Sequence, residues 1–587
     1  MALKHDVADE LEAYANLLEM DGVEYKPNVY RRAVESIREY PGSLEALAED
    51  GEDALQALDD VGDAISSKIV EFHETGAIEE LEAMRERYPV DLDALLRVEG
   101  VGPKTVGTLY EELGVTDLDE LEAAAEDERI QDVKGFGAKT EQNILEAIPF
   151  ARQAGERELL GAARPVAERV RAFVSEHDAV ENAEVAGSTR RWRATIGDVD
   201  VLAASDDGQA VVDAFAAWEP ADAVIEAGEQ KASVRFDGMR IDLRVVVPSE
   251  FGSALQYFTG SKDHNVTLRN YAIDQGVKLN EYGAFDVSDV DDVDADADDG
   301  QRVGERIGGD TEASMYAALD LPLVPPELRE GRGEVRAAID DALPDLLVEA
   351  DVRGDLHTHT DASDGANSVR EMVAGAKAFG HEYVAITDHA TGPGVVGGMG
   401  VPDDALLDLA DEVAAVNDDV DGITAFSGVE ANVDADGEIS VADDVLAELD
   451  VVVASPHSSL DMPGDEATDR LCTAMEHPSV DVLGHPTGRL LNQREGLDLD
   501  ANRLAAVAAR EGVALEVNAN PSRLDLSGSA VKAAVDAGAT VSINTDSHRP
   551  ETYENVTYGV HTARRGWAEP DDVLNTYDED ALREFLH

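Results

Sequence analysis

The sequence is poor in cysteine, in basic residues and in long apolar runs, and each shortage excludes a class of protein. Its 587 residues include a single cysteine, Cys472, so no disulfide can form within the chain, as is usual in a reducing cytoplasm. No apolar run approaches the roughly 18 residues that a membrane span needs. The N-terminal stretch is acidic with a helical period, which matches neither a signal nor a transit peptide.

Basic residues are strongly outnumbered. The 47 lysines and arginines stand against 125 aspartates and glutamates, which gives a formal net charge of −78. Nucleic-acid binding normally requires a basic patch, so this balance argues against such a partner. However, the acidic residues are spread over every segment, as on a surface adapted to molar salt. At about 1 M salt the Debye length is about 3 Å, and such a surface would hardly repel DNA. Net charge bears on solubility and milieu, so the motifs must decide the partner.

Apolar residues make up 43% of the chain, which is typical of globular proteins, and the length predicts several domains. The first 150 residues or so indicate short helices with three similar glycine-containing turns, at 58–62, 98–104 and 133–139. Such similarity can mean a helical solenoid, but the turn is shared and the helix faces are not. A binding hairpin used three times is therefore favoured.

The middle of the chain changes character. Strand patterns occupy about 180–247, and mixed helix and hairpin patterns occupy about 250–325. The acidic tract at 286–300 indicates a solvated hairpin tip, and the proline-rich stretch at 321–334 indicates a linker.

Beyond about residue 350, short β-branched runs alternate with alanine-rich helices, which predicts the parallel strands of an α/β barrel. His357 and His359 lie two residues apart on one strand and therefore point to the same face. One such pair is more often a cap or a buried hydrogen-bonded ring. Here, however, nearly every strand ends in a residue that can bind metal, at the barrel end that carries sites. The nine candidates are His357, His359, Asp364, His389, Glu430, His457, His485, Asp546 and His548.

Imidazole and carboxylate ligands suit Zn²⁺ or Mn²⁺, and nine of them exceed one tetrahedral site. Two or three clustered ions would activate water and stabilise an in-line phosphoryl displacement. From about residue 351 to the C-terminus these motifs resemble the PHP domain, named for polymerases and histidinol phosphatase. The resemblance implies a distorted seven-stranded β/α barrel with a cluster of three metal ions.

A second set of acids lies in the strand-rich region. Asp198 and Asp200 share one face of a strand, and Asp242 lies in a strand expected to pair nearby. Three converging carboxylates are costly unless cations neutralise them, and two Mg²⁺ ions would do so, as in nucleotidyl transfer. In so acidic a chain the Asp-x-Asp pattern alone is no evidence. The turn GSTRR just upstream supports it, because Ser188 and Arg191 can hold triphosphate oxygens against the same metals.

An aromatic pair, Tyr257 and Phe258, precedes a kink at Gly260. The pair could pack against a sugar and exclude a 2′-hydroxyl, although alone it is better explained as a helix end with core aromatics. Together, GSTRR, DVD, IDLRV and YFTGSKDHN resemble a family X DNA polymerase of the beta type, over residues 1 to about 325.

That resemblance implies that the three aspartates bind the catalytic Mg²⁺ or Mn²⁺ ions and that Ser188 and Arg191 contact the triphosphate. Tyr257, Phe258, Gly260 and Asn265 would contact the sugar and base. The chain departs from the family at Trp192, where a small glycine is usual. The conformation of this loop and its affinity for nucleotide are therefore open.

The three glycine turns resemble helix-hairpin-helix motifs, which hold DNA phosphates with backbone N–H groups and helix N-termini. The second and third copies fit well, through Gly100, Gly102, Gly135 and Gly137, whereas the first has Asp60 in place of the leading glycine.

Lys68 lies where beta-type enzymes keep a Schiff-base lysine that removes a 5′-deoxyribose phosphate. Such chemistry requires neighbouring charge or burial to lower the pKa of the amine. Lys26 and Tyr30 match positions that the family uses near the 5′-phosphate. A plain surface lysine on a helix explains Lys68 almost equally well.

The resemblances predict a multidomain chain with α-helical, α+β and α/β parts. The expected domains are a helical lyase-like domain with a helix-hairpin-helix (1–82), a helix-hairpin-helix DNA-binding domain (83–150), a nucleotidyltransferase palm (151–248), a nucleotide-selecting thumb (249–325), a linker (326–348) and the PHP barrel (349–587).

The implied function is a DNA polymerase that fills short gaps in DNA repair, including base excision repair. The PHP domain is expected to act as a 3′–5′ exonuclease, and cleavage of abasic sites and lyase activity are further expectations. Gapped or primer-template DNA and dNTPs are the expected partners. The protein is expected to be a cytoplasmic monomer that does not bind a membrane.

Two other functions stay open on the sequence. One is a small-molecule phosphatase like those of the histidinol phosphatase branch, with the front half as an adaptor. The other is a DNA-binding scaffold without catalysis. The complete triad and the complete nine-ligand set argue against the scaffold, because vestigial sites usually lose ligands.

Overall fold

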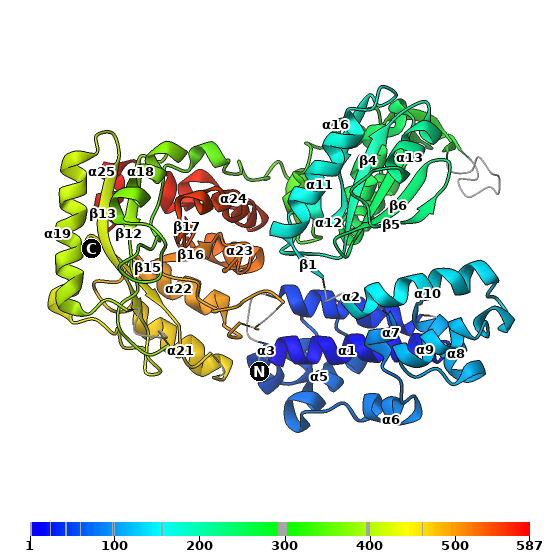
Figure 1. Cartoon of the computed structure of the whole chain (residues 1–587), viewed down its shortest axis with the longest axis horizontal. Helices are drawn as coiled ribbons and strands as arrows, with labels where there is room; N and C mark the ends of the chain where they lie inside the picture. The colour runs from blue at the N-terminus through cyan, green and yellow to red at the C-terminus, as the bar shows by residue number, and fades with distance from the viewer. Residues whose placement is uncertain are drawn as a thin grey trace.

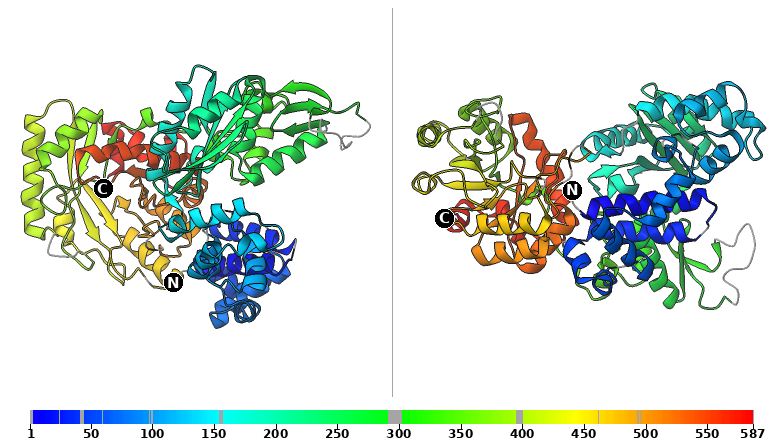
Figure 2. Two further views of the ribbon diagram at one scale, coloured as in Figure 1. Left: turned by 45° about the vertical axis from the view of Figure 1, so that its right-hand side comes forward. Right: turned by 90° about the horizontal axis from the view of Figure 1, so that it is seen from below.

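The chain folds into three lobes, coloured from blue to red along the sequence in Figure 1. The computed structural model describes residues 3–586 except 24, 41–43, 59, 97, 99, 154–156, 291–301, 395–399, 461, 493 and 495. We name the helical lobe (3–153), the sheet lobe (157–345) and the barrel lobe (346–586). The turned views of Figure 2 show the helical and sheet lobes on one side of the barrel lobe. The predicted multidomain fold class is confirmed.

The helical lobe is built from short helices whose apolar faces meet in one core, with Leu11, Ile37 and Ile69 fully buried in it. Short helices are marginal alone, so their packing supplies most of the stability. The helices are α1 (Leu3–Met20), α2 (Lys26–Glu39), α3 (Leu44–Asp50), α4 (Glu52–Leu55), α5 (Asp63–Thr75), α6 (Glu79–Arg87), α7 (Leu92–Leu96), α8 (Pro103–Leu113), α9 (Leu118–Glu126) and α10 (Ala138–Gln153).

The first half of the sheet lobe contains a five-stranded sheet in the order β2-β4-β7-β6-β5, with helix α11 (Leu160–Ser175) packed on it. Strands β4 and β7 are parallel neighbours, and every other pairing in the sheet is antiparallel. The edge strand β5 was missed from the sequence because its side chains are mostly exposed and show no apolar alternation. The strands are β2 (Asn182–Val185), β4 (Asp198–Ala204), β5 (Ala223–Ala227), β6 (Lys231–Phe236) and β7 (Met239–Val246).

Smaller elements complete this lobe. They are a separate antiparallel pair of short strands, a three-stranded sheet and several helices. The predicted hairpin tip in the acidic tract falls on residues 291–301, which lie outside the described part of the chain. The elements are β1 (Glu158–Leu159), β3 (Thr195–Ile196), α12 (Gly187–Arg190), α13 (Gly208–Ala216), α14 (Phe251–Thr259), α15 (Lys262–Asp274), β8 (Val277–Asn280), β9 (Gly283–Asp286), β10 (Glu305–Gly308) and α16 (Glu312–Ala317).

The segment predicted as a linker connects the sheet lobe to the barrel lobe and has structure of its own. It forms a 3-10 turn, η4 (Pro326–Leu328), and helix α17 (Glu334–Ile339). Arg329 and Glu334 are fully buried, and Arg329 bonds to Glu312 at 2.6 Å. Paired charges on this segment let it pack between the sheet and barrel lobes.

The barrel lobe contains seven parallel strands in chain order, and every run predicted from the sequence is a strand. A bridge between Thr358 and Ser547 brings the first strand beside the last and nearly closes the barrel. The strands are β11 (Gly354–Asp355), β12 (Tyr383–Ile386), β13 (Thr424–Asn432), β14 (Val451–Ser455), β15 (Val482–Leu483), β16 (Ala514–Asn518) and β17 (Val541–Asn544).

Helices cover the outside of the barrel and bury alanine and leucine against the strands. They are α18 (Val369–Phe379), α19 (Asp403–Asp419), α20 (Asp443–Leu446), α21 (Gly464–Met475), α22 (Ala501–Glu511), α23 (Gly528–Ala537), α24 (Val556–Arg565) and α25 (Glu579–Phe585). Among the described residues, no helix combines the length and apolarity needed to cross a membrane.

Candidate active sites and nucleic-acid interface

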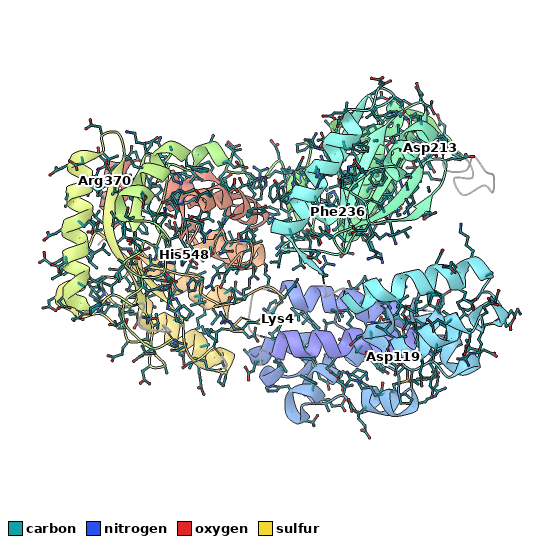
Figure 3. All side chains as sticks on the ribbon, in the orientation of Figure 1. Lys4, Asp119, Asp213, Phe236, Arg370 and His548 are labelled. Atoms are coloured by element: carbon teal, nitrogen blue, oxygen red, sulfur yellow. The ribbon has the colours of Figure 1, made fainter. Side chains whose placement is uncertain are left out.

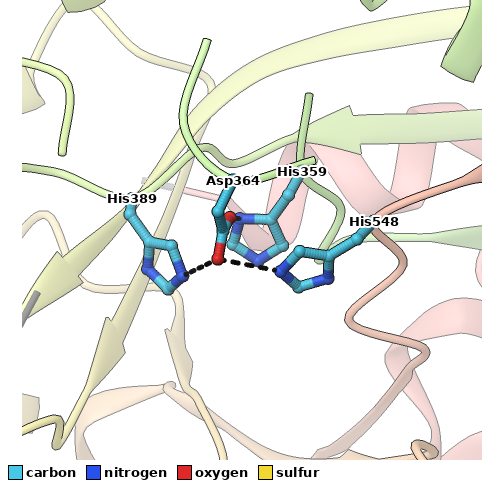
Figure 4. Close-up of side chains that lie close together, drawn as sticks. All are labelled: His359, Asp364, His389 and His548. Carbon is cyan, nitrogen blue, oxygen red and sulfur yellow. Dashed lines mark ion pairs between the residues drawn. The ribbon is translucent and has the colours of Figure 1, made fainter. Parts of the chain in front are cut away.

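The nine predicted ligands gather at the carboxyl ends of the barrel strands. Figure 4 shows one group, in which the Asp364 carboxylate lies between three imidazoles, 3.4 Å from His389 and 3.2 Å from His548. His485 belongs to none of the groups but contacts Glu430 at 2.9 Å. In each group, one imidazole nitrogen or carboxylate oxygen from every member lies within 4.8 Å of the others. The three groups are His359, Asp364, His389 and His548; His357, His359 and Asp546; and His389, Glu430 and His457.

The donor atoms in this cluster are buried and lack hydrogen-bond partners within the described part of the chain. They include both ring nitrogens of His359, Nε2 of His357 and His457, and Oε2 of Glu430. A buried polar atom left unpaired costs about 1–3 kcal/mol, so a protein keeps such a set only if something else satisfies it. Metal ions fit these nitrogen and oxygen donors.

Electrostatics favours the ligating form of the central carboxylate. Burial alone would raise the pKa of Glu430, but the imidazoles of His457, His389 and His357 hold it well below its usual range. The carboxylate is therefore ionised, which is the form that binds a cation.

Two residues that sequence reasoning missed orient the histidine rings. Glu516 Oε1 lies 2.8 Å from Nδ1 of His357, and Asn432 Oδ1 lies 2.7 Å from Nδ1 of His457. Each contact turns the other ring nitrogen toward the cluster, as ligand-orienting partners do in metal sites. Glu516 left a signal in the sequence, because it is a lone acid in the apolar run VALEVN.

The three aspartates of the sheet lobe also converge. Asp200 on β4 stands directly opposite Asp242 on β7, and the facing oxygens of Asp198, Asp200 and Asp242 lie within 4.8 Å of one another. Burial and repulsion from Asp198 and Asp242 raise the pKa of Asp200 to about 7. Because the triad repels itself, it is a site that cations would stabilise. Arg240 pairs with Asp242 at 2.8 Å.

Gly187 links the GSTRR turn to the triad. A Cβ added to this glycine would lie 2.0 Å from Oδ2 of Asp200, and its φ of 61° already favours glycine. The turn can therefore approach the aspartates only with glycine at this position.

The predicted triphosphate ligand Arg191 is engaged within the protein. Its Nε donates to Glu330 at 3.1 Å, and a second nitrogen donates to the carbonyl oxygen of Thr259. These contacts fix Arg191 between the turn and the end of α14, while its charge still acts on Asp200. Ser188 is half-buried on α12 beside it.

Phe258 lines a cavity of about 200 Å³ together with Asp200 and Asp242. Tyr257 packs edge-on against Phe258, with ring centroids 5.1 Å apart. Asn265 is buried, and its side-chain amide bonds to Gln256 and to the Tyr257 carbonyl. Asn265 therefore holds the aromatic pair in place.

The loop at Gly260 adopts a positive φ of 67°, which explains the glycine there. It follows the aromatic pair on α14, and a Cβ at this position would lie 3.2 Å from a guanidinium nitrogen of Arg191. The predicted kink therefore lies against the arginine of the GSTRR turn.

The three glycine turns of the helical lobe share one backbone conformation. Asp60, Gly100 and Gly135 have φ values of 59°, 81° and 102°. An aspartate tolerates this left-handed conformation better than most residues, so the first copy keeps the turn despite its substitution. The predicted repetition therefore extends to all three hairpins.

The second glycine of each turn has a different explanation. Gly102 and Gly137 each directly precede a helix, and neither has a positive φ. A Cβ at either position would meet no atom of the chain within 4 Å. Since the fold does not require glycine there, the space suits a ligand that approaches the backbone closely.

Lys68 is mostly buried, and its ammonium bonds to Glu80 at 2.8 Å. The hydrogen bond from Lys68 is the largest of several contacts that lower the pKa of Glu80. Lys26 is exposed at the start of α2, whereas Tyr30 is buried against Tyr14. A Schiff base forms from a neutral amine, so Lys68 would first have to leave Glu80.

Comparisons with known proteins agree with this arrangement. Four family models match: a helix-hairpin-helix domain at 3–78, a SAM-like helix-hairpin-helix tandem at 92–148, a DNA polymerase beta thumb at 254–330 and a PHP domain at 355–520. The DNA polymerase/3′-5′ exonuclease PolX of Bacillus subtilis (strain 168) is 35% identical over 587 residues, 99% of each chain.

Other relatives cover much less of the chain. A probable phosphatase of Shewanella sp. (strain MR-4) is 34% identical over 33% of this chain and 75% of its own length. A probable phosphatase of Thermoanaerobacter sp. (strain X514) is 26% identical over 40% of this chain and 93% of its own length.

The fold and the two carboxylate- and histidine-based clusters define a metal-dependent enzyme that joins a nucleotidyltransferase to a PHP phosphoesterase. The chain belongs to the family X DNA polymerases that carry a C-terminal PHP domain, the family of the Bacillus polymerase/exonuclease.

Proposed function

We propose that this enzyme fills short gaps during DNA repair, including base excision repair, and trims 3′ ends with its barrel lobe. The observation that carries the proposal is that one chain brings together two separate sets of side chains whose chemistry fits cations, the aspartate triad and the barrel cluster. The same two clusters and the full-length likeness to a polymerase/exonuclease support both activities.

Asp198, Asp200 and Asp242 would hold two Mg²⁺ or Mn²⁺ ions, which supply charge neutralisation for the attacking and leaving oxygens. Gly187 lets the GSTRR turn approach these acids, and Ser188 and Arg191 on that turn would orient the triphosphate. The cavity beside Phe258 is where the incoming nucleotide would pack.

The nine barrel residues would hold a cluster of Zn²⁺ or Mn²⁺ ions, which supplies an activated water for phosphodiester cleavage. Glu516 and Asn432 keep the rings of His357 and His457 oriented. Single nucleotides at a 3′ end are the proposed substrate, and abasic sites and blocked 3′ ends belong to the same chemistry.

Gapped or primer-template DNA and dNTPs are the proposed partners, and a cytoplasmic monomer is the proposed state. The helix-hairpin-helix turns would bind DNA phosphates through the backbone at Gly100, Gly102, Gly135 and Gly137. Lys26 would contact the 5′-phosphate, with Tyr30 supporting the same surface from beneath. Excision of a 5′-deoxyribose phosphate by Lys68 is proposed as a further step, and borohydride trapping that persists in Lys68→Ala would exclude it.

The decisive experiment uses a labelled primer in a one-nucleotide gap with a 5′-phosphate, at high KCl with Mn²⁺, with and without dNTPs. We expect Asp200→Ala to abolish extension only, and His359→Ala to abolish shortening only. Loss of both activities in either variant would contradict two independent sites. If the wild-type chain does neither but hydrolyses a free phosphomonoester, the phosphatase alternative replaces this proposal, as the partial relatives suggest.

The acidic composition supports a further proposal, that the chain is adapted to molar salt. With a formal charge of −78, self-repulsion falls as the Debye length shrinks from about 10 Å at 0.1 M to about 3 Å at 1 M. We therefore expect the melting temperature and the polymerase rate to rise with KCl toward molar levels. Maximal activity at low salt with collapse above about 0.5 M would contradict the adaptation.

A further inference from the structure

A cavity of about 590 Å³ lies where the three lobes meet. Lys4 and Tyr40 line it from the helical lobe, 192–195 from the sheet lobe, and residues between Thr487 and Arg565 from the barrel lobe. Figure 3 shows Lys4 at the end of α1 that faces the barrel lobe. The volume falls within the range of about 300–1,000 Å³ that is typical of ligand sites. None of the residues assigned above to metal, nucleotide or lyase chemistry lines this junction cavity.

The junction cavity is lined by positive charge in a strongly negative chain. No aspartate or glutamate occurs among its described lining residues, although the chain as a whole has more than twice as many acids as bases. The cations that line it are Lys4, Arg193, Arg489, Arg494 and Arg565.

Carboxylates that do not line the cavity contact three of these cations. Arg193 and Arg565 share a single carboxylate, Glu330, which also binds Arg191. Lys4 lies 3.5 Å from Asp498.

Arg494 forms no salt bridge with a described carboxylate and donates to the carbonyl oxygen of Gly488 at 2.6 and 3.0 Å. Burial and the neighbouring Arg523 lower the pKa of Arg494, while the carboxylate of Asp525 acts in the opposite direction. A cavity of this charge fits an anion.

Contacts extend from the junction cavity to both metal-binding clusters. On one side, Arg157 bonds to Thr195 in the cavity wall and lies beside Gly197, the neighbour of Asp198. Asn492 in the wall bonds to the backbone of Arg157. Arg157 therefore connects the wall of the cavity to the residue that precedes the aspartate triad.

On the other side, Arg489 in the wall donates to the carbonyl oxygen of Arg523 at 2.8 Å. The guanidinium of Arg523 lies 3.7 Å from Asp546 in the barrel cluster. Arginines therefore lie on both sides of the cavity, Arg157 toward the aspartate triad and Arg523 toward the barrel cluster.

We propose that the junction cavity holds phosphates of a single DNA strand whose 3′ end passes between the aspartate triad and the barrel cluster. The inference rests on the proposed function, since it assumes one enzyme that both extends and shortens a primer. Leucines such as Leu490 and Leu524 form apolar walls beside the cations, and bases pack on such walls while phosphates bind the guanidinium groups.

The first test uses Ser529, which lies on the cavity wall in the first turn of α23. Ser529→Glu introduces a negative charge, whereas Ser529→Gln has the same size without it. A carboxylate is favourable at a helix N-terminus, so Ser529→Glu should melt at or above the wild-type temperature, and the melting temperature of Ser529→Gln is measured beside it.

The assay uses a primer with one mispaired 3′ nucleotide, with metal, dNTPs and a heparin trap that limits each enzyme to one DNA encounter. We expect the fraction of primers shortened and then extended to fall about tenfold in Ser529→Glu and less than twofold in Ser529→Gln. Extension of a paired primer and shortening of a single strand, both without trap, should stay unchanged. Equal fractions in the two variants would overturn the inference, while inactive wild-type enzyme would instead overturn the proposed function.

A metal-free binding test distinguishes a strand from a free nucleotide. In EDTA, binding to fluorescent oligo-dT is measured at several salt concentrations, and the salt slope is the decrease in log affinity per unit of log salt concentration. This slope should fall by about 0.7 in Arg494→Gln, the value for one lost single-strand phosphate contact. Arg503→Gln, on the outer surface of α22 with a similar loss of charge, should leave the slope unchanged. An unchanged salt slope in Arg494→Gln would show that no strand phosphate binds in the cavity. Displacement of oligo-dT by millimolar dAMP from the wild-type protein but not from Ser529→Glu would show that the cavity binds a free nucleotide and not a strand.

Discussion

Trp192 shows how one residue can serve a different purpose from the glycine that is usual at its position. Its φ of 56° is in the left-handed region, which costs a residue with a side chain about 1–2 kcal/mol. The indole stacks on His561 of the barrel lobe, with ring centroids 3.6 Å apart, and Arg164 covers it at 4.4 Å. The question about the conformation of this loop therefore has a structural answer: the backbone has the positive φ that favours glycine, and the side chain joins two lobes.

Gly187 gives a residue-scale prediction for the polymerase site. Gly187→Ala would place a Cβ 2.0 Å from Asp200 Oδ2 at a φ of 61°, so the turn must move away from the triad. Displacement of catalytic groups by about 1 Å costs about 100-fold in rate. We expect primer extension to fall by about that factor while 3′ shortening is unchanged. Extension within threefold of wild type would show that the turn is not held against Asp200.

Glu516 gives the corresponding prediction for the barrel cluster, as a positioning residue. Glu516→Gln keeps the size but weakens the contact to Nδ1 of His357, and loss of such a partner typically costs about 10–100-fold in metal affinity or activity. We expect a higher Mn²⁺ concentration for half-maximal 3′ shortening and normal primer extension. Metal content after dialysis is the independent readout, and a content equal to wild type would contradict the role.

Among elements, the three hairpins are the clearest case of a repeated structure with an external purpose. Each places a residue with a left-handed backbone conformation before the start of a helix. A Cβ added at the second glycine of each hairpin would meet no atom of the chain within 4 Å. Backbone N–H groups there keep their geometry in concentrated salt, where a grip based on counterion release weakens.

We predict that Gly102→Ala leaves the free energy of unfolding within about 0.5 kcal/mol of wild type, as for surface changes, because its Cβ meets no atom of the chain. DNA binding should weaken several-fold, since the methyl group would meet the phosphate. Gly107→Ala is the matched control: its Cβ would lie 2.5 Å from Met20 O, so it should lose stability. Unchanged DNA affinity in Gly102→Ala would show that this hairpin does not contact DNA.

The segment from 326 to 348, which the sequence predicts as a linker, contacts the barrel lobe through buried charges. Glu327 bonds to His561 at 2.7 Å and to Arg564 at 2.8 Å on α24. A polar composition can therefore accompany burial when each charge meets a partner from another lobe.

At the scale of the molecule, ionic contacts of this segment connect the lobes. Burial alone would raise the pKa of Glu327, but the hydrogen bond from His561 and the Arg564 guanidinium lower it to about 2. Burial lowers the pKa of His561 itself, so the neutral ring donates while Arg564 supplies the charge. The glutamate is ionised at neutral pH and stabilises the junction between the sheet and barrel lobes.

The sign of the pH dependence follows from that lowered pKa. Stability contributed by Glu327 is fully present above its ordinary pKa of 4.5 and is lost as pH falls toward about 2. We expect Glu327→Gln to reduce the unfolding free energy by about 3 kcal/mol at pH 6, measured by denaturant titration at constant salt. The difference from wild type should shrink steadily between pH 4.5 and 2. A constant difference over that range would contradict the ionic origin.

The sequence by itself determined the local features of this protein. Strand periodicity and the position of His357, His389 and Asp546 at strand ends follow from short-range patterns, and so does the repeated hairpin turn. The likeness to a polymerase and a PHP domain followed from motifs of the same short range. These predictions needed only neighbouring residues, because side-chain direction in a strand alternates at every residue.

The tertiary structure alone decided the contacts between distant residues. The barrel must nearly close before His357 meets Glu516 at 2.8 Å, and the lobes must dock before Trp192 stacks on His561. The junction cavity exists only where all three lobes meet. Such contacts join residues far apart in the chain, and no periodicity or spacing encodes which surfaces pack together.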